Sequence, residues 1–405
     1  MSLQSIIDNR EKYAQYMVDE ITHICTKIPK RGPGSEGEKL SCEYMGEKMK
    51  ELGCDRVAVE AYKENPGSFY GWIYITISCC FLALASYFFM PVLSIVFIIA
   101  GLLLCVLQFG LYKKTVDKLF KEETGHNVHG FKKPTGEVKR RIIFNGHPDA
   151  AWEWPFKYMF TWLGFDIHMV VCFIGAFYTL GIAIAKLAGV LSDELAKTLG
   201  LIALVFVPFW FAFYFMWNSK KVVDGANDNL SGCYIGMAIL KALHDEGIEF
   251  ENTEVGVVLT GSEEAGLRGA MAWAEKHKDE LQDVPTFIYS YDGIAQSEYL
   301  MVNYRDLNST VKADKDVGDL FYESCEELGV PCKKGAVPPL GGATDSAAFS
   351  QAGLRAVGMT ALNHALPDFY HTRLDTPDAL NPKCLADCFA ASVKALEKFD
   401  KGAKQ

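Results

Sequence analysis

A long run without any charged residue constrains this chain more than any other feature. Between Glu64 and Lys113 none of the residues carries a charge, and Met90-Pro91 divides the run into two apolar halves. Each half approaches the ~20 residues that an α-helix needs to cross a hydrocarbon core of ~30 Å. We therefore expect residues 65–112 to form a hairpin of two transmembrane helices that turns at Pro91.

A second apolar pair follows at residues 167–185 and 198–218, and Trp217 stands near its end, where interfacial aromatic residues collect. Residues 165–219 are therefore predicted to be a second transmembrane hairpin. The alternative is a set of buried helices in a soluble dimerisation arm. Four apolar segments of this length in one chain argue against that alternative.

The lysines that flank the apolar segments indicate the orientation. Because both insertions are hairpins, all polar blocks must lie on one side of the bilayer. The opposite side offers only Lys186 and Lys197, and positive charge accumulates on the cytoplasmic side of membrane proteins. We expect a multi-pass protein of a prokaryotic plasma membrane whose polar domain faces the cytoplasm, on the side of Lys113, Lys114, Lys118, Lys121, Lys157, Lys220 and Lys221.

Charge and cysteine spacing exclude two other classes. A formal net charge of −10 argues against a nucleic-acid partner, because phosphate contacts need clustered lysine and arginine. The twelve cysteines include no CxxC pair, so neither a cysteine-ligated zinc site nor a disulfide framework is predicted.

Without the hairpins, residues 1–64, 113–164 and 220–405 read as one domain of alternating strands and helices. Ser35-Glu-Gly-Glu38 is a capping box that opens a helix, and Gly53 is expected to stop it. Such alternation predicts a mixed, mostly parallel sheet covered by helices, in which ligands bind beyond the carboxyl ends of the strands. The predicted strands are RVAVEAY, RRIIFN, TEVGVVLT, PTFIYSY and LRAVGMTAL.

Histidine and acidic residues gather where these strands end. Each motif alone is commonplace, because GHPD is usually a turn and SEEAGL resembles an ordinary acidic helix start. Their joint occurrence at one sheet edge is specific, and nitrogen with oxygen ligands suits divalent zinc. In chain order the motifs are GHPD at 146–149, DGANDN at 224–229, GSEE at 261–264, Asp292 and YHT at 370–372.

This series of motifs resembles the M28 metallopeptidase family. The order GHPD, GANDNLSG, SEEAGLRGA, a strand-ending aspartate, TDSAAF and YHTRLDT is similar to that family's pattern, and PKRGPGSEGE looks like its N-terminal signature. The resemblance covers the polar chain from about residue 20 to 400. It implies a three-layer α/β/α zinc-exopeptidase fold, into which four transmembrane helices are inserted here.

The resemblance also implies a role for each site residue. Asp228 would bridge two zinc ions, or other divalent metals; His147 and Asp292 would complete one site, and Glu264 and His371 the other. Glu263 falls on the general base, Asp149 on the position that fixes the imidazole of His147, and Tyr370 on a donor to the oxyanion. Two metals can activate one water between them, while Glu263 takes and later delivers its proton.

The implied function is a membrane-anchored aminopeptidase that removes N-terminal residues from peptides. A carboxypeptidase or dipeptidase of the same fold, a single-zinc enzyme like glutaminyl cyclase, and an inactive membrane scaffold remain alternatives. Because the second hairpin separates His147 from Asp228, we hypothesise that the pocket mouth borders the bilayer and that the substrates are apolar peptides. Thr344-Asp345-Ser346 stands where many relatives have Ser-Asp-His. Because that histidine is not a metal ligand in the family, we expect the difference to alter the shape of the pocket more than metal binding.

Overall fold

The computed structural model describes residues 2–363 and 365–404, and they form two compact units. Unit 1 comprises residues 1–66, 122–152 and 222–405; unit 2 comprises residues 67–121 and 153–221. Unit 2 is thus two insertions into the chain of unit 1. A two-stranded sheet of β4 (Trp152–Glu153) and β5 (Asn218–Val222) contains the residues at which the second insertion begins and ends.

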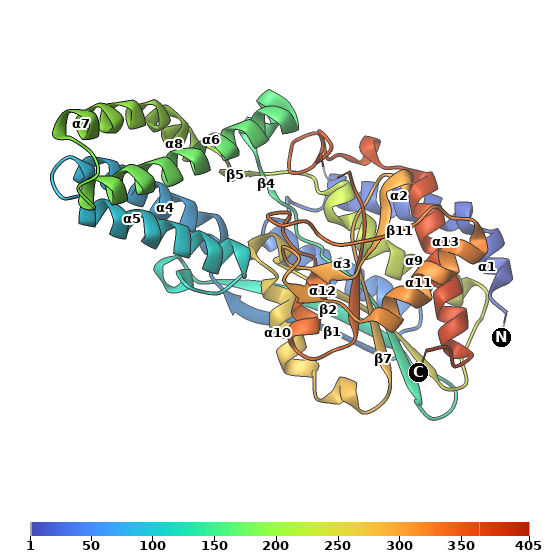
Figure 1. The fold of residues 1–405 in the computed structure, drawn as a ribbon. Helices are drawn as coiled ribbons and strands as arrows, with labels where there is room; N and C mark the ends of the chain where they lie inside the picture. Colours follow the sequence, from blue (N-terminus) through green and yellow to red (C-terminus); the bar gives the residue numbers. More distant parts are fainter. Residues whose placement is uncertain (1, 364, 405) are drawn as a thin grey trace. The chain divides into compact units, whose positions relative to one another are not determined.

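Unit 1 is built on an eight-stranded sheet in the order β1-β2-β6-β3-β7-β12-β8-β11 (Figure 1). The neighbouring strands β6, β3, β7 and β12 are parallel, whereas β1, β2 and the β12–β8 pair are antiparallel. The prediction of a mixed, mostly parallel sheet is therefore confirmed. The strands are β1 (Arg56–Glu64), β2 (Glu123–Lys132), β3 (Arg140–Gly146), β6 (Thr253–Thr260), β7 (Thr286–Ile294), β8 (Leu300–Asn303), β11 (Lys333–Gly335) and β12 (Ala356–Ala361).

Helices cover both faces of this sheet, which gives the expected three layers (Figure 1). One face carries the large apolar core and is covered by α1 (Gln4–Asp8), α2 (Arg10–Lys27), α3 (Glu36–Glu51), α9 (Ser231–Asp245), α11 (Lys315–Leu328) and α13 (Pro382–Asp400). The other face is covered by α10 (Arg268–His277) and α12 (Asp345–Gln351), which pack on each other through Trp273 and Phe349.

Local sequence signals explain the helix that the capping box predicts. The hydroxyl of Ser35 accepts a hydrogen bond from the backbone N–H of Glu38, so α3 begins where the motif places it. The helix ends at Glu51, and Gly53 follows with φ of +81°, a conformation that glycine adopts without steric cost.

Unit 2 consists of apolar helices that pack against one another. They are α4 (Ser68–Tyr87), α5 (Pro91–Cys105), α6 (Pro155–Leu187), α7 (Asp193–Ile202) and α8 (Val207–Phe213). Four spans are long and apolar enough to cross a membrane, judged by length and composition only: Ser68–Tyr87, Pro91–Gly110, Pro155–Leu187 and Asp193–Phe213. Helix α6 begins at Pro155 and kinks at Thr161, so the predicted boundary at 164/165 lies inside it.

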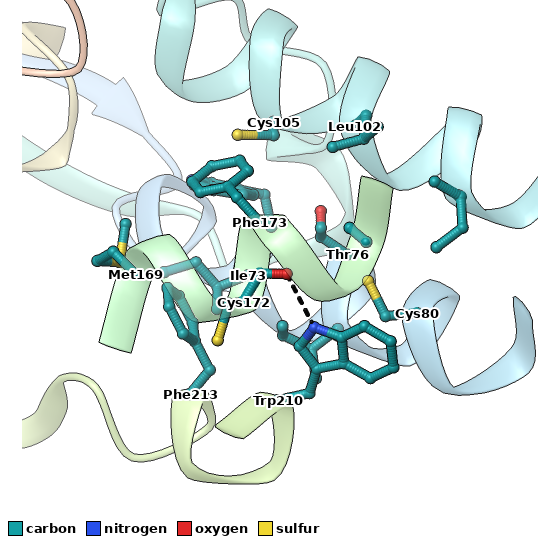
Figure 2. A pocket seen from close by; sticks show the side chains of 14 residues that line it. Ile73, Thr76, Cys80, Leu102, Cys105, Met169, Cys172, Phe173, Trp210 and Phe213 are labelled. Carbon is teal, nitrogen blue, oxygen red and sulfur yellow. Dashed lines mark hydrogen bonds between the residues drawn. The ribbon is translucent and has the colours of Figure 1, made fainter. Parts of the chain in front are cut away.

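An apolar cavity of about 50 Å³ lies among α4, α5, α6 and α8 (Figure 2). Its wall includes Met169, Phe173 and Trp210, and the Trp210 indole Nε1–H donates to the carbonyl oxygen of Cys172 at 3.1 Å. The Thr76 hydroxyl donates to the carbonyl of Gly101 at 3.2 Å. Both groups are therefore satisfied within the helices, which leaves the wall apolar.

The outer surface of unit 2 is unusually apolar. Among the described residues, all large hydrophobic side chains that are exposed lie in unit 2, except Val59, Leu340 and Leu374. A water-soluble surface carries such side chains singly rather than in continuous sheets. The surface of unit 2 is therefore suited to an apolar medium.

Candidate metal centre

The site lies at the edge of the sheet where its parallel strands end. His147 follows β3 directly, Glu263 and Glu264 follow β6 after a two-residue turn, and Asp292 stands near the end of β7. Because β3 is parallel to both β6 and β7, these ends meet at one edge. Asp228 comes from the segment before α9.

Asp228 lies between two groups of possible metal ligands. Its Oδ1 is 3.5 Å from Nε2 of His147, whereas its Oδ2 is 3.1 Å from Nε2 of His371. Asp292 Oδ1 is 3.8 Å from the same nitrogen of His147, and Glu264 Oε1 is 3.2 Å from that of His371. Two clusters able to hold a metal result, and Asp228 is common to both.

The two neighbouring glutamates point in different directions. Glu264 faces His371, while Glu263 Oε2 lies 3.8 Å from Nε2 of His147. Asp149 fixes both, because its two carboxylate oxygens accept the backbone N–H groups of Glu263 and Glu264, each at 3.1 Å. Asp149 Oδ1 also lies 3.3 Å from Nδ1 of His147, so one carboxylate orients the imidazole and both glutamates.

The donor atoms fit a cation. Asp228 Oδ2, Glu264 Oε1 and His147 Nε2 are buried and make no hydrogen bond of good geometry among the described residues. Asp228 Oδ2 and Glu264 Oε1 both face Nε2 of His371, and His147 Nε2 faces the other oxygen of Asp228. Buried polar atoms rarely remain unsatisfied, because each costs about 1–3 kcal/mol. Carboxylate oxygens and imidazole nitrogens are ligands of zinc, so the set is chemically suited to it.

Electrostatics favour the same conclusion. Burial raises the pKa of Glu264 to about 7, against the lowering effect of His371. Burial alone would lower the pKa of His371, but the carboxylates of Glu264 and Asp228 raise it to about 9. The acidic groups repel one another in a buried place, and positive charge at the centre would relieve that repulsion.

Two functional residues that the sequence analysis did not assign hold the segment around Asp228. Asp375 accepts hydrogen bonds from the backbone N–H groups of Asn227 at 2.8 Å and Asp228 at 3.0 Å. Arg31, which is 1% exposed, donates to the carbonyls of Pro148 at 2.7 Å and Asp224 at 2.6 Å. Asp375 lies in YHTRLDT and Arg31 lies in PKRGPGSEGE, two of the motifs on which the family resemblance rests. Their presence in these motifs was the sequence signal that could have identified them.

The structure places the remaining predicted residue, Tyr370, differently from the ligands. Its ring is half-buried and stacks on the imidazole of His371, with ring centroids 4.0 Å apart and an interplanar angle of 14°. Asp345 was not assigned a role, yet it is buried and accepts from the hydroxyl of Thr260 at 2.5 Å. Burial raises the pKa of Asp345 to about 7. His147 and the hydroxyl of Thr260 act to lower this pKa, whereas the carboxylate of Asp149 acts to raise it.

A third group, Glu60 with His129 and His277, also has metal-ligand spacing. The indole N–H of Trp273 donates to Nδ1 of His129 at 3.1 Å, which forces the proton of a neutral imidazole onto Nε2. That nitrogen then has no lone pair for a metal. His277 Nε2 lies 2.9 Å from Oε2 of Glu60, so the group is better described as a structural hydrogen-bonded pair.

Comparison with known proteins agrees with this geometry. Residues 216–396 match the profile of Peptidase family M28. The chain carries an M28 peptidase domain. The matched range contains Asp228, Glu263, Glu264, Asp292 and His371, and the predicted class of enzyme, a metallopeptidase, is confirmed. No curated protein is similar enough in sequence to match.

Solved structures share the fold of the M28 domain. BSAP, a zinc aminopeptidase from Bacillus subtilis, has 13% identity and a TM-score of 0.57, covering 95% of this chain and 94% of its own. An aminopeptidase from Aneurinibacillus sp. strain AM-1 also has 13% identity and 0.57, covering 96% and 95%. A glutaminyl cyclase from Porphyromonas gingivalis has 10% identity and 0.55, covering 97% and 98%. The predicted fold is therefore confirmed.

Proposed function

We propose that this M28 domain is a di-zinc aminopeptidase and that unit 2 anchors it in a membrane. The observation that carries the catalytic part is the position of Asp228, whose two oxygens face separate clusters of one histidine and one carboxylate each. A single shared carboxylate suits two neighbouring cations. His147 and Asp292 would hold one zinc, and Glu264 and His371 the other.

The protein's own residues provide the proton chemistry. When bound, a pair of zinc ions supplies a water of low pKa and polarises the scissile carbonyl. Glu263 is the general base because it alone of the two glutamates faces away from His371, and it can later deliver its proton to the leaving amine. Asp149 holds that carboxylate in place through the backbone. Tyr370 stacks on His371 at the edge of the site, and its phenol would donate to the oxyanion.

Two neighbouring activities differ from this proposal in what the site must contain. A cyclase-like enzyme with a single zinc would leave one of the two clusters around Asp228 without a function. A carboxypeptidase would need a cation for the substrate carboxylate, and the site is instead rich in acidic groups, which can receive a free α-ammonium. These observations support removal of N-terminal residues from peptides.

Membrane anchoring is supported by the four long apolar helices and by the apolar outer surface of unit 2. We propose that unit 1 faces the cytoplasm of a prokaryote. Lys186, one of two lysines on the far side, folds back and donates to the carbonyl of Tyr87 at 2.9 Å, which caps α4 rather than presenting a free charge. Fusion of fluorescent protein or alkaline phosphatase to the C-terminus tests the side: cytoplasmic fluorescence without phosphatase activity supports the proposal.

The decisive experiment combines a metal count with a substrate panel on protein purified in detergent. We expect two zinc ions per chain, release of residues from free N-termini, and no action on N-blocked peptides. Glu263→Gln should lower kcat about 10³-fold while keeping both metals, because it removes proton transfer and leaves the ligands intact. Glu275→Gln is the matched control, since that side chain is 74% exposed on α10 and forms an ion pair only with Lys278 within the described part of the chain.

Other outcomes would redirect the assignment. One zinc per chain with cyclisation of N-terminal glutamine would favour the cyclase alternative, and no metal with no turnover would favour an inactive scaffold. The preference for apolar peptides needs its own test, which compares apolar and polar dipeptides on enzyme in lipid and in detergent. Equal turnover under all four conditions would contradict a site that borders the bilayer.

A further inference from the structure

The turn that carries the two glutamates contains a buried group of three polar side chains behind it. We call Glu38, Glu64 and Ser262 the Ser262 cluster. Ser262 and Glu38 are fully buried and Glu64 is 4% exposed. The Ser262 hydroxyl oxygen lies 2.7 Å from Oε2 of Glu38 and 2.6 Å from Oε1 of Glu64.

The short contacts of the Ser262 cluster require more than one proton. A hydroxyl carries one proton and can donate to only one of the two carboxyl groups. The second oxygen pair, at 2.6–2.7 Å, is a hydrogen bond only if the other carboxyl group is itself protonated and donates to the serine oxygen. Two ionised carboxylates around one hydroxyl would leave one pair of oxygens in repulsion. The cluster therefore holds one carboxyl proton in addition to that of the serine.

The groups around the cluster favour retention of this proton. Burial, followed by the carboxylates of Asp149 and Glu64, raises the pKa of Glu38 well above its ordinary value near 4.5. Two backbone N–H groups act in the opposite sense, that of His126 at 2.8 Å and that of Gly34 at 3.3 Å. The other titratable side chains that face Glu38 are those of Tyr62 on β1 and Cys42 on α3, and burial raises the pKa of both.

Ser262 needs support because its backbone is strained. It has φ of +53° and ψ of +40°, a left-handed conformation that costs a residue with a side chain about 1 kcal/mol or more. This turn sends Glu263 and Glu264 in their different directions. Neighbouring contacts fix the same turn: the Tyr62 hydroxyl donates to the carbonyl of Gly261 at 2.8 Å, and the Gly261 N–H donates to Asn127 at 2.9 Å.

We propose that the Ser262 cluster shares a proton and thereby positions Glu263 and Glu264 for the reaction. Asp149 holds the backbone N–H groups of the glutamates from one side, and the cluster holds the preceding residue from the other. Glu38, Glu64 and Ser262 are positioning residues that do not touch the reacting atoms. The inference rests on the proposed peptidase function only for its kinetic readout.

The first experiment measures stability against pH and does not depend on activity. A carboxyl group whose pKa is raised on folding stabilises the fold below its unfolded pKa, and this stabilisation is lost as pH rises through the folded pKa. In wild type the folding equilibrium constant should therefore fall by up to about tenfold per pH unit in that window. Glu38→Gln and Glu64→Gln, whose amides donate permanently, should flatten this dependence, whereas Glu47→Gln at an exposed position of α3, the helix that carries Glu38, should not.

The second experiment measures kcat, KM and metal content. Ser262→Gly relieves the backbone strain while it removes the hydroxymethyl side chain, so a loss of about tenfold in kcat with both metals retained indicates positioning by the cluster. Full kcat in Ser262→Gly, or an unchanged pH dependence of stability in both glutamine variants, would overturn the proposal. If wild type showed no hydrolysis at all, the stability result would still decide the proton sharing separately.

Discussion

The two units of this chain differ in how they use burial. Unit 1 places its apolar side chains inside and buries a set of acidic groups and histidines at one sheet edge. Unit 2 exposes many of its large apolar side chains. Inside it some polar groups are paired, as Thr76 is with Gly101, whereas the indole N–H of Trp72 and the hydroxyl of Ser94 have no hydrogen-bond partner among the described residues. The surface of unit 2 is thus more apolar than that of unit 1. What distinguishes unit 1 is that several of its unsatisfied nitrogen and oxygen atoms lie together in groups with metal-ligand spacing.

The strongest test of this contrast makes the same substitution in each unit. Asp228→Asn should lower kcat/KM about 10³-fold and reduce the metal content, because the amide cannot serve both clusters as the carboxylate does. Asp117, which accepts from Ser68 at 2.8 Å and Gln108 at 3.0 Å in unit 2, is the counterpart. Asp117→Asn should leave turnover within about twofold, since Asp117 belongs to neither of the ligand groups around Asp228. Steady-state kinetics and elemental analysis measure both.

Removal of metal should affect the stability of one unit only. A ligand present at about 1,000 times its dissociation constant stabilises the folded state by about 4 kcal/mol. A chelator should therefore lower the free energy of unfolding of unit 1 by about that amount, and its melting temperature with it. Unit 2 contains none of the predicted ligands, so its transition should not move. Differential scanning calorimetry with and without chelator separates the two. A single transition that shifts as a whole would show that the units do not unfold independently.

A charge placed on each surface tests the solvent of unit 2. Phe177 on α6 is 58% exposed, and Phe177→Arg should cost about 2.5–3.5 kcal/mol if the residue faces lipid. Less protein should then reach the membrane fraction. Val59 on the edge strand β1 is 39% exposed, and Val59→Arg should change stability by less than about 0.5 kcal/mol. Equal yields of both variants in the membrane fraction would argue that unit 2 faces water.

The smallest effect concerns the cavity of unit 2. Trp210→Phe removes the hydrogen bond from the indole to the Cys172 carbonyl and leaves most of the ring, so we expect a loss of about 1 kcal/mol. Unfolding in mixed detergent measures this cost, and peptidase activity in native detergent should not change. A parallel loss of activity would mean that the packing of unit 2 influences the catalytic unit.

Sequence signals predicted the strand-end site because parallel topology brings strand ends together whatever the loops do. The motifs around His147, Asp228, Glu263 and His371 therefore identified residues that the structure brings together, although their roles remain predictions. The positions of Arg31 and Asp375 were not assigned, because their contacts are with backbone groups whose location depends on the folded loops.

Strand β2 shows the same limit in the fold. Its sequence, ETGHNVHGFK, lacks apolar alternation, since polar side chains on it find partners inside the protein. Asn127 donates to the carbonyl of Gly269 at 3.0 Å, and His129 accepts from Trp273. β2 forms because it pairs with β1 and β6 in the folded sheet, and these pairings cannot be predicted from the local sequence of β2. The predicted boundary at 164/165 likewise lies inside α6, because Asp166 interrupts the apolar run although the helix continues through it.

The position of the second insertion determines the order in which the candidate ligands are synthesised. His147 leaves the ribosome before the apolar helices α6 to α8, and Asp228, Glu264, Asp292 and His371 follow only after them. If unit 2 is delivered to a bilayer as we propose, the nascent chain contains only His147 of the five candidate ligands while its hydrophobic segments are being inserted. Neither metal cluster can assemble at that stage, so the proposed activity would begin only after insertion is complete.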